Sequence, residues 1–599
     1  MDVTLEAGAL SDTVEVSSNA GETVNTTSGE VVRVVDGQQV QDLSLNARNY
    51  LQVVTLIPGA PLLDDEDPLG QSVNGNTARP INGNRGNANN LTIDGGFNLD
   101  SGNIGNQTNN VGLDFIREVK IQTSNFSAEY GRQAGAAINI VTRGGTNQFH
   151  GSLYEFLRNE QLDANNFFSN ASNLPRSPLR FNNFGYSLGG PVRKDKLFFF
   201  VGQEWKYVRQ GILPLRRTLP TRRELAGDFS ARAGLLLRDP LKTGACNAGN
   251  QTACFPGNVI PAGRITADGR AIAAFYLQSI GLAASFDDRP VANNAVFQNP
   301  SPYDFRQEFA RIDYQLNDRH TIYGRYLHDR NINIDPLGIN GGNQLPNVPT
   351  RRNRPGTGLL LAHIWAINPR LINEAKANAS WNGQRIIAVE TSADRAKYGF
   401  TFPQVFPAGG RFPNAIPAID INGYPTAGVR GTASALISPA TDISLTDNLS
   451  LTRGSHAFKT GLLVVRSRKD QNGQNVPYSG SISFNTGSNP NSTGNALADA
   501  LLGNFRTYTE AAGEPYGFLR YTQFDAYATD NWKLNRRLSL ELGVRYQYGQ
   551  PFRTSPPRSA SITMLCGPTR VTPRFRCGSA MRSPITTRCN STPPNARAS

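Results

Sequence analysis

The chain has 599 residues, of which 38% are hydrophobic, and its 60 Lys and Arg outnumber 47 Asp and Glu to give a formal net charge of +13. No apolar run approaches the ~20 residues that a membrane-spanning helix needs. With 58 Gly, 37 Pro and almost no helical periodicity, this excludes a helical membrane protein and favours a β-rich chain with many turns.

The basic charge does not indicate a nucleic-acid-binding protein, because much of it lies in one short segment. Residues 553–599 contain eight Arg, no Lys and no acidic residue. Taking these eight away from +13 leaves +5 for the other 552 residues, whereas nucleic-acid binding calls for a basic face. We interpret residues 553–599 as an out-of-frame tail; a genuine basic tail is the alternative.

The N-terminal part reads as short strands and turns. Met1 is not followed by the apolar core of a signal peptide. Residues 2–16 alternate apolar and polar like an exposed strand. We interpret the start as a truncation, or alternatively as a miscalled start codon, and these residues as the last strand of a missing β-sandwich. We then predict a strand that ends at Val35, a turn at Asp36-Gly37, and a short amphipathic helix over residues 43–57.

Residues 71–112 are rich in Asn and Gly, yet regularly spaced apolar residues predict ordered loops and short strands. Residues 89–96 read as a strand and then a turn at Asp94-Gly95. Two more strands, 116–121 and 136–142, flank a bend at 126–132. Gly144-Gly145 ends this small unit.

From residue 149 onward the chain predicts longer strands with one apolar and one polar face. At 10 to 13 residues most of them exceed the ~5–6 residues typical of soluble sheets and match the ~9–11 residues that cross a bilayer as a tilted strand. Tight turns alternate with very long loops, as in outer-membrane barrels. A soluble β protein remains the alternative. The predicted strands are 149–158, 180–190, 196–208, 305–315, 319–329, 356–367, 371–381, 442–452, 455–467, 517–531 and 536–548.

Few residues suggest chemistry. Cys246 and Cys254 enclose seven residues and predict a disulfide, because a zinc site would need two further ligands nearby. The five His are scattered, and no nucleophile elbow, phosphate loop or HExxH motif occurs. We therefore expect no enzyme activity, no cofactor and no metal site.

Several motifs, taken in order, resemble those of TonB-dependent outer-membrane transporters, in particular the Oar-like group. Residues 89–95 (NNLTIDG) are similar to the plug motif that ends in a strand and Asp-Gly. Residues 126–145 (FSAEYGRQAGAAINIVTRGG) are similar to the last plug segment, and 149–156 and 189–200 to the start of the barrel. The plug-motif residues are Asp94, Gly95, Glu129, Tyr130, Gly131, Gly135, Asn139 and Thr142.

The resemblance implies a plug inside a transmembrane antiparallel β-barrel of 22 strands, of which about half are predicted here. It also implies a location in the bacterial outer membrane, contact with outer-membrane lipid, and uptake of a large or scarce solute. The energy would come from an inner-membrane complex through TonB. The segment of Asp12, Thr13, Val14, Glu15 and Val16 resembles the box that TonB binds by strand addition, although these residues would equally complete the truncated sandwich.

The expected domains follow from these boundaries. Residues 1–20 end a truncated sandwich or form the TonB-box-like segment, 21–145 form the plug, 146–552 form the N-terminal part of the barrel, and 553–599 form the aberrant tail. A half barrel leaves open edges that lipid cannot satisfy, so we interpret the chain as a fragment. The alternative function is a surface-exposed adhesion or structural β protein.

Overall fold

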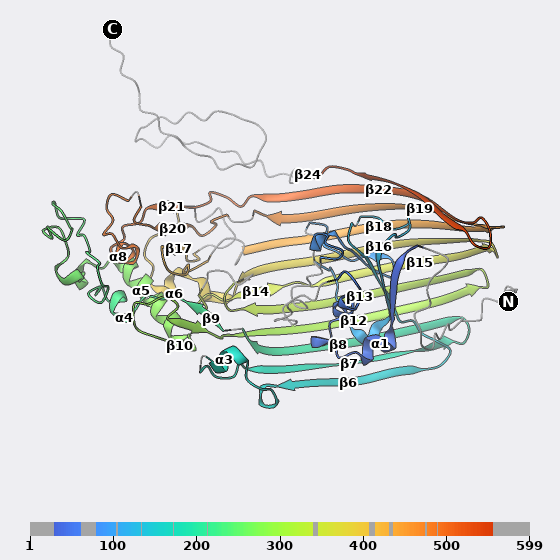
Figure 1. Cartoon of the computed structure of the whole chain (residues 1–599), viewed down its shortest axis with the longest axis horizontal. Helices are drawn as coiled ribbons and strands as arrows, with labels where there is room; N and C mark the ends of the chain where they lie inside the picture. Colours follow the sequence, from blue (N-terminus) through green and yellow to red (C-terminus); the bar gives the residue numbers. More distant parts are fainter. Residues whose placement is uncertain are drawn as a thin grey trace, which may run out of the picture.

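The computed structural model describes residues 29–60, 80–102, 106–132, 134–171, 173–212, 214–338, 345–406, 414–429, 435–473, 476–487 and 489–554. Within these ranges the chain forms three parts, which are visible in Figure 1. A small N-terminal β unit, the plug, lies against a long antiparallel sheet, the wall. Loops and short helices at one end of the wall form the cap.

Among the described residues, none of the helices combines the length and the apolar character needed to cross a membrane.

The plug is built on a five-stranded sheet in the order β1-β4-β5-β2-β3. The pairing of β2 with β5 is parallel, and the other three pairings are antiparallel. The predicted strand before Asp94-Gly95 and the two strands around the bend are confirmed as β2, β4 and β5. The plug elements are β1 Val31–Asp36, α1 Gly37–Asp42, η1 Asn46–Arg48, η2 Tyr50–Leu56, η3 Gly86–Ala88, β2 Asn90–Ile93, β3 Gly96–Phe97, η4 Leu113–Phe115, β4 Ile116–Ser124 and β5 Ala137–Thr142.

Two predictions near the start of the plug are wrong. Asp36 and Gly37 do not form a turn; Asp36 caps α1, and its carboxylate accepts a hydrogen bond from the Gln39 amide at 2.8 Å. The single helix predicted over residues 43–57 is replaced by two 3-10 segments. Ala47 and Arg48 have φ values of 56° and 52°, and this left-handed backbone interrupts any continuous helix.

All eleven long strands predicted for the wall are present, and each pairs with its neighbours in an antiparallel ladder. They range from 10 residues in β6 to 19 in β18. Among the described residues, β6 and β23 are the two end strands of this sheet. The strands are β6 His150–Asn159, β7 Leu179–Arg193, β8 Leu197–Gly211, β12 Pro300–Asn317, β13 His320–Asp335, β15 Gly356–Asn368, β16 Leu371–Ala388, β18 Ala435–Arg453, β19 His456–Asn472, β22 Tyr516–Lys533 and β23 Ser539–Gly549, with two short additions, β14 Thr350–Asn353 and β24 Arg553–Thr554.

The wall has an inner face toward the plug and an apolar outer face. In β15 the side chains of Leu359 and Leu361 are 51% and 57% exposed, whereas Leu360 between them is 3% exposed. Polar residues such as Arg325 and Asp329 of β13 are buried on the inner face. Apolar side chains directed outward and polar side chains directed inward are the arrangement of a barrel wall that faces lipid.

The cap has a hydrophobic core of its own, which the sequence did not predict. The core draws on the connections β8–β12, β13–β15, β16–β18 and β19–β22, and its centre is α5, where Phe275 and Tyr276 are fully buried. Helix α8 packs closely on α5, since a Cβ on Gly269 would lie 2.1 Å from the Leu501 carbonyl oxygen. The elements on this side of the wall are α3 Phe167–Ala171, β9 Leu215–Arg217, α4 Arg222–Leu225, α5 Ala267–Gly281, β10 Ser285–Phe286, β11 Ala295–Phe297, α6 Arg395–Tyr398, β17 Ala418–Ile421, β20 Ser481–Phe484, α8 Ala496–Leu502, β21 Thr507–Thr509 and the 3-10 turns η5 Glu160–Leu162, η6 Pro256–Asn258, η7 Ala262–Arg264 and η8 Glu390–Ala393.

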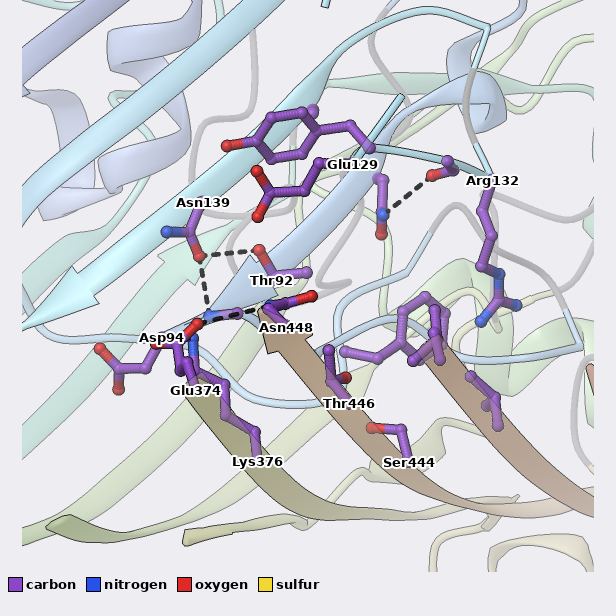
Figure 2. A pocket seen from close by; sticks show the side chains of 18 of the residues that line it. Thr92, Asp94, Glu129, Arg132, Asn139, Glu374, Lys376, Ser444, Thr446 and Asn448 are labelled. Atoms are coloured by element: carbon purple, nitrogen blue, oxygen red, sulfur yellow. Dashed lines mark hydrogen bonds and ion pairs between the residues drawn. The ribbon is translucent and has the colours of Figure 1, made fainter. Parts of the chain in front are cut away.

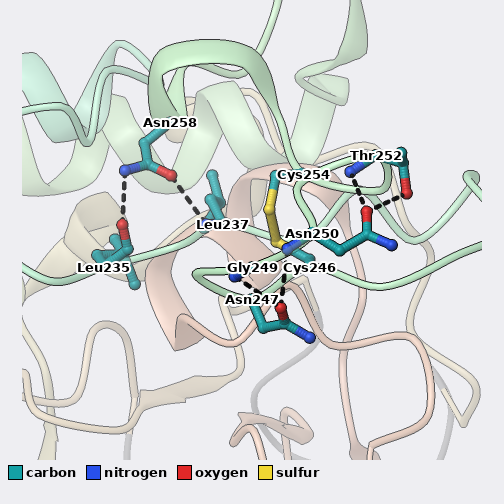
Figure 3. Close-up of a disulfide and its surroundings, with 9 residues drawn as sticks. All are labelled: Leu235, Leu237, Cys246, Asn247, Gly249, Asn250, Thr252, Cys254 and Asn258. Carbon is teal, nitrogen blue, oxygen red and sulfur yellow. Dashed lines mark hydrogen bonds between the residues drawn. A yellow bond between two sulfur atoms is a disulfide. The ribbon is translucent and has the colours of Figure 1, made fainter.

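A disulfide closes one loop of the cap, residues 244–254, which we call the finger. Cys246 and Cys254 are bonded, with their Cα atoms 5.0 Å apart. Inside the loop the Asn247 side chain accepts a hydrogen bond from the Gly249 amide at 3.0 Å, and the Asn250 side chain accepts one from the Thr252 amide at 3.1 Å (Figure 3). The finger is thus stabilised by a covalent bond and by local Asn contacts.

Replacing both Cys246 and Cys254 with Ser is expected to loosen this finger by about 2–3 kcal/mol, because the unfolded loop gains conformational freedom. Limited proteolysis should then cut within residues 244–254 faster than in the parent chain. Because the plug has a separate core, its protease resistance should not change, and loss of that resistance would contradict the separation of cap and plug.

Candidate functional site

A cavity of about 360 Å³ lies where the plug meets the inner face of the wall (Figure 2). Its plug side comes from β2, β5 and the bend at 129–132, and its wall side from β12, β13, β16, β18, β19, β22 and β23. Polar and charged side chains from both parts project toward one another here, as Figure 2 shows for Asp94, Glu129, Lys376 and Asn448.

Asp94 ends β2 in a left-handed conformation, with φ of 53°, and Gly95 follows with φ of 82°. This tight turn directs the Asp94 carboxylate back toward the end of β5. The carboxylate accepts hydrogen bonds from the Thr142 amide at 2.8 Å and from the Thr142 hydroxyl at 2.9 Å. Asp94 therefore ties the end of β2 to the last residue of the plug sheet.

Two arginines of the wall approach the same carboxylate. The guanidinium of Arg311 lies 3.6 Å from Asp94 and that of Arg325 lies 3.5 Å from it. Asp94 and Arg325 are buried, and the Arg311 side chain is 13% exposed. Arg311 also donates to the Thr142 carbonyl at 3.3 Å and to Asp313 at 2.7 Å. Because a buried charge needs an opposite charge and hydrogen bonds, this cluster fixes the plug to β12 and β13.

Asn139 of β5 holds the same turn from the other side. Its side-chain oxygen accepts hydrogen bonds from the Thr92 hydroxyl at 2.8 Å and from the Gly95 amide at 3.0 Å. Gly95 itself lies close to the inner face of the wall, since a Cβ there would be 3.0 Å from the Lys376 ammonium. A left-handed backbone and close contact with the wall together explain a glycine at this position.

The bend at 129–132 makes the third contact with the wall. Glu129 pairs with Lys459 of β19 at 2.5 Å. Arg545 of β23 donates to the backbone carbonyls of Ala128 and Glu129 at 3.0 and 2.7 Å. A Cβ on Gly131 would lie 2.2 Å from the Arg545 side chain, so this arginine crosses the bend in close contact with the glycine.

On its other side the plug is anchored by aromatic packing. Phe115 of η4 stacks on Phe309 with ring centroids 5.2 Å apart and meets Phe200 edge-on at 6.5 Å. Gly202 provides the space, because a Cβ there would be 2.3 Å from the Phe115 ring. Burial raises the pKa of the neighbouring Asp114 carboxyl, and the Arg48 guanidinium at 2.5 Å opposes this shift.

Further polar contacts connect the plug loops to the wall. Asp329 accepts a hydrogen bond from the Asn110 amide at 2.7 Å, and Gln307 accepts one from the Gly112 amide at 2.8 Å. Asp100 and Lys469 form a buried ion pair at 2.7 Å. The plug is therefore held on several strands of the wall by individually breakable contacts rather than by one continuous sheet.

The predicted plug-motif residues lie together in this structure. Six of the eight line the cavity, whereas Gly135 and Thr142 do not, although Thr142 donates a hydrogen bond to Asp94. From the alternating strand pattern, we predict that the lumen-facing Arg311 and Arg325 contact substrate or the plug, with a role in lining a wet interior as the alternative. The structure places both beside Asp94 of the plug. The sequence did not single out Lys376, Lys459 and Asp100. A search for charges at inward-facing strand positions would have found the two lysines. The TonB-box-like residues 12–16 lie outside the described residues.

Within the described part of the chain, no group of three or more His, Cys, Asp and Glu side chains could hold a metal ion. Several polar groups at the cavity, such as Asp94, Arg311 and Glu129, hold the plug on the wall.

Replacing Asp94 with Asn tests the charge at the centre of this contact. Asn tolerates the left-handed backbone and keeps an acceptor for Thr142, but it leaves Arg311 and Arg325 without their shared counter-charge. The change is expected to reduce stability by about 3–5 kcal/mol, measured by denaturant unfolding in detergent.

The control is Glu129→Gln, which breaks an ion pair whose side chains are 34% and 24% exposed. Because solvent screens such a pair, its loss should cost less than about 1 kcal/mol. Equal losses for the two variants would show that burial of the Asp94 cluster does not determine its strength.

The comparisons with known proteins agree with this architecture. The outer membrane beta barrel domain family matches residues 141–566, which is more than half of the chain. The TonB-dependent transporter Oar of Myxococcus xanthus is 32% identical over 163 residues, which cover 26% of this chain and 14% of that protein. The outer membrane transporter YddB of Escherichia coli has a similar fold, with a TM-score of 0.51 at 11% identity.

The structural match covers 86% of this chain and 56% of YddB, so the chain spans about half the length of that transporter. The resemblance to Oar-like proteins and the prediction of a plug with a transmembrane β wall are both confirmed. The apolar outer face of the wall is thus a lipid-facing surface. The chain belongs to the outer membrane beta barrel domain family of proteins that reside in the bacterial outer membrane.

Proposed function

We propose that this chain is the plug and part of the barrel of a TonB-dependent transporter that takes up a large or scarce solute across the outer membrane. Residues 21–145 would be the plug and 146–552 the barrel part. The observation that carries the proposal is the docking of the plug on the inner face of the wall through Asp94, Arg311 and Arg325.

Such a transporter needs a plug that is stable at rest and can still be displaced. The plug–wall contacts described here meet both needs, since they combine ion pairs, hydrogen bonds and one aromatic stack. In the strand pairings of the described residues, the plug sheet and the wall sheet are separate. Displacing the plug would therefore break side-chain contacts one after another and leave the β ladder of the wall intact.

TonB is the proposed partner, with residues 12–16 as its binding segment. An extended segment that adds as a strand to a partner uses its backbone amides and carbonyls for affinity. The alternation of Thr13, Val14 and Glu15 suits such pairing, and the nearby plug would receive the pulling force. Energy from the inner-membrane complex would reach the Asp94 cluster along this route.

We infer a transporter rather than an enzyme. The relatives named above are transporters. Several polar residues at the cavity bind the plug to the wall, and the contacts of the described cavity residues do not pair a nucleophile with a general base. The alternative of an adhesion protein gives no reason for a plug that is held by a buried charge cluster.

Replacing Val14 with Pro tests the TonB interaction. Proline removes one backbone donor and fixes φ, so it should disrupt strand addition. Binding of the purified chain to the isolated periplasmic domain of TonB should fall by about tenfold or more, measured by titration in detergent.

Thr26→Pro in the same N-terminal segment serves as the matched control and should change binding by less than about twofold, because it lies outside the pairing strand. If the parent chain does not bind the TonB domain at all, the transporter proposal fails and the adhesion protein becomes the better account. If both Pro variants lose binding equally, residues 12–16 are not the TonB-binding segment.

A further inference from the structure

The short turns of the wall share a strong positive charge that neither the plug contacts nor the proposed transport explains. Five tight turns connect β7 to β8, β12 to β13, β15 to β16, β18 to β19 and β22 to β23, all at the end of the wall opposite the cap (Figure 1). Counting the strand residues that bound them, these turns contain nine Arg and Lys and two acidic side chains, and all eleven residues are exposed. The basic residues are Arg193, Lys194, Lys196, Arg319, Arg370, Arg453, Lys533, Arg536 and Arg537, and the acidic ones are Asp195 and Asp318.

This bias is local. The whole chain has 60 basic residues for 47 acidic ones, whereas the turns have nine for two. Each of the five turns contributes at least one Arg or Lys, although the turns are far apart in the sequence. The charges therefore form a collar along one rim of the wall, which we name the basic collar.

Aromatic side chains lie on the outer face immediately beside the basic collar. Trp365 and Phe458 are 38% and 41% exposed, and each lies within three residues of a turn. His320 stacks on Trp365 with ring centroids 5.5 Å apart and lies in hydrogen-bonding contact with His363 at 3.0 Å. His456 stacks on Trp532 at 5.2 Å. Aromatic belts of this kind mark the level of the lipid headgroups in outer-membrane barrels.

We propose that the basic collar binds the phosphate groups of anionic glycerophospholipids in the inner leaflet of the outer membrane. Short turns lie on the periplasmic side of such barrels, where the leaflet consists of glycerophospholipids. With the aromatic belt at headgroup level, the flanking Arg and Lys side chains reach the phosphate plane. Clustered basic residues next to a membrane attract anionic lipid electrostatically. This inference uses only the membrane location and does not require the proposed transport.

The four tryptophans of the chain allow the lipid next to the basic collar to be compared with the lipid at the other end of the strands. Trp365 and Trp532 lie beside the basic collar. Trp205 lies eight residues after the first residue of β8 and Trp381 ten residues after the first residue of β16, or about 26 and 33 Å along the strands. Trp381 is 40% exposed on the outer face, so this second pair reports on the opposite leaflet.

The test uses the whole chain in lipid vesicles and measures quenching of tryptophan fluorescence by lipid brominated near the headgroup. One variant, W205F/W381F, keeps Trp365 and Trp532, which we call the collar pair. Another variant, W365F/W532F, keeps Trp205 and Trp381, which we call the distant pair. In mixed vesicles the bromine is carried either by phosphatidylglycerol or by phosphatidylcholine. The collar pair should be quenched about twofold more by brominated phosphatidylglycerol, and the distant pair equally by both lipids.

Charge variants then separate binding from folding. Replacing all nine basic residues of the collar with Gln should abolish the preference of the collar pair, whereas replacing only its six Arg with Lys should retain it. High salt should weaken the preference, since these charges are exposed. Equal quenching by both lipids at the collar, a preference that survives the nine Gln substitutions, or the same preference at the distant pair would each overturn the proposal. Loss of the preference with Lys would also overturn it, because charge would then not be the cause.

Discussion

The wall sheet contacts hydrocarbon on its outer face and a polar interior on its inner face, and the other parts of the structure depend on this constraint. A strand exposed to hydrocarbon on one side must present apolar side chains there and pair all of its backbone groups with neighbouring strands. Its alternate side chains then face inward, where polar residues are found. Those inward-facing charges need partners of their own, and the plug supplies several of them.

The Asp94 cluster shows how this need becomes a structural link. Arg311 and Arg325 are on neighbouring strands of the wall and would be costly to bury alone. Asp94 provides a counter-charge to each of these two arginines. It does so from a turn that requires a left-handed backbone. The same carboxylate binds Thr142, where the plug sheet ends and the chain leaves for the wall. One side chain therefore contributes both to the internal order of the plug and to its attachment to the wall.

The three parts differ in how they hold together, and this difference suits different roles. The wall depends on a continuous backbone ladder, and the cap on a separate hydrophobic core with a disulfide. The plug has its own sheet and core, and side-chain contacts attach it to the wall. Breaking the plug contacts would disturb neither the ladder nor the cap core. The basic collar adds a fourth surface, at the rim where the wall meets the headgroups.

Strand positions in the wall could be predicted because a period of two residues, aromatic ends and tight turns are local signals. For the same reason, Asp94-Gly95 and the bend at 129–132 were found from local motifs. The helix over residues 43–57 was predicted wrongly, since apolar spacing does not reveal the left-handed Ala47 and Arg48. The cap core was missed because its apolar residues come from four separate connections, which only the fold brings together.

The sequence by itself determined the strand-turn pattern, the two-sided wall and the plug motif, because each depends on residues close together in the chain. Only the tertiary structure decided which wall residues meet the plug: Arg311, Arg325, Lys459 and Lys469 are selected by strand register and by where the plug docks. The basic collar likewise became visible only when five distant turns came to one rim. Contacts of this kind join residues tens to hundreds of positions apart, and no local pattern encodes such distances.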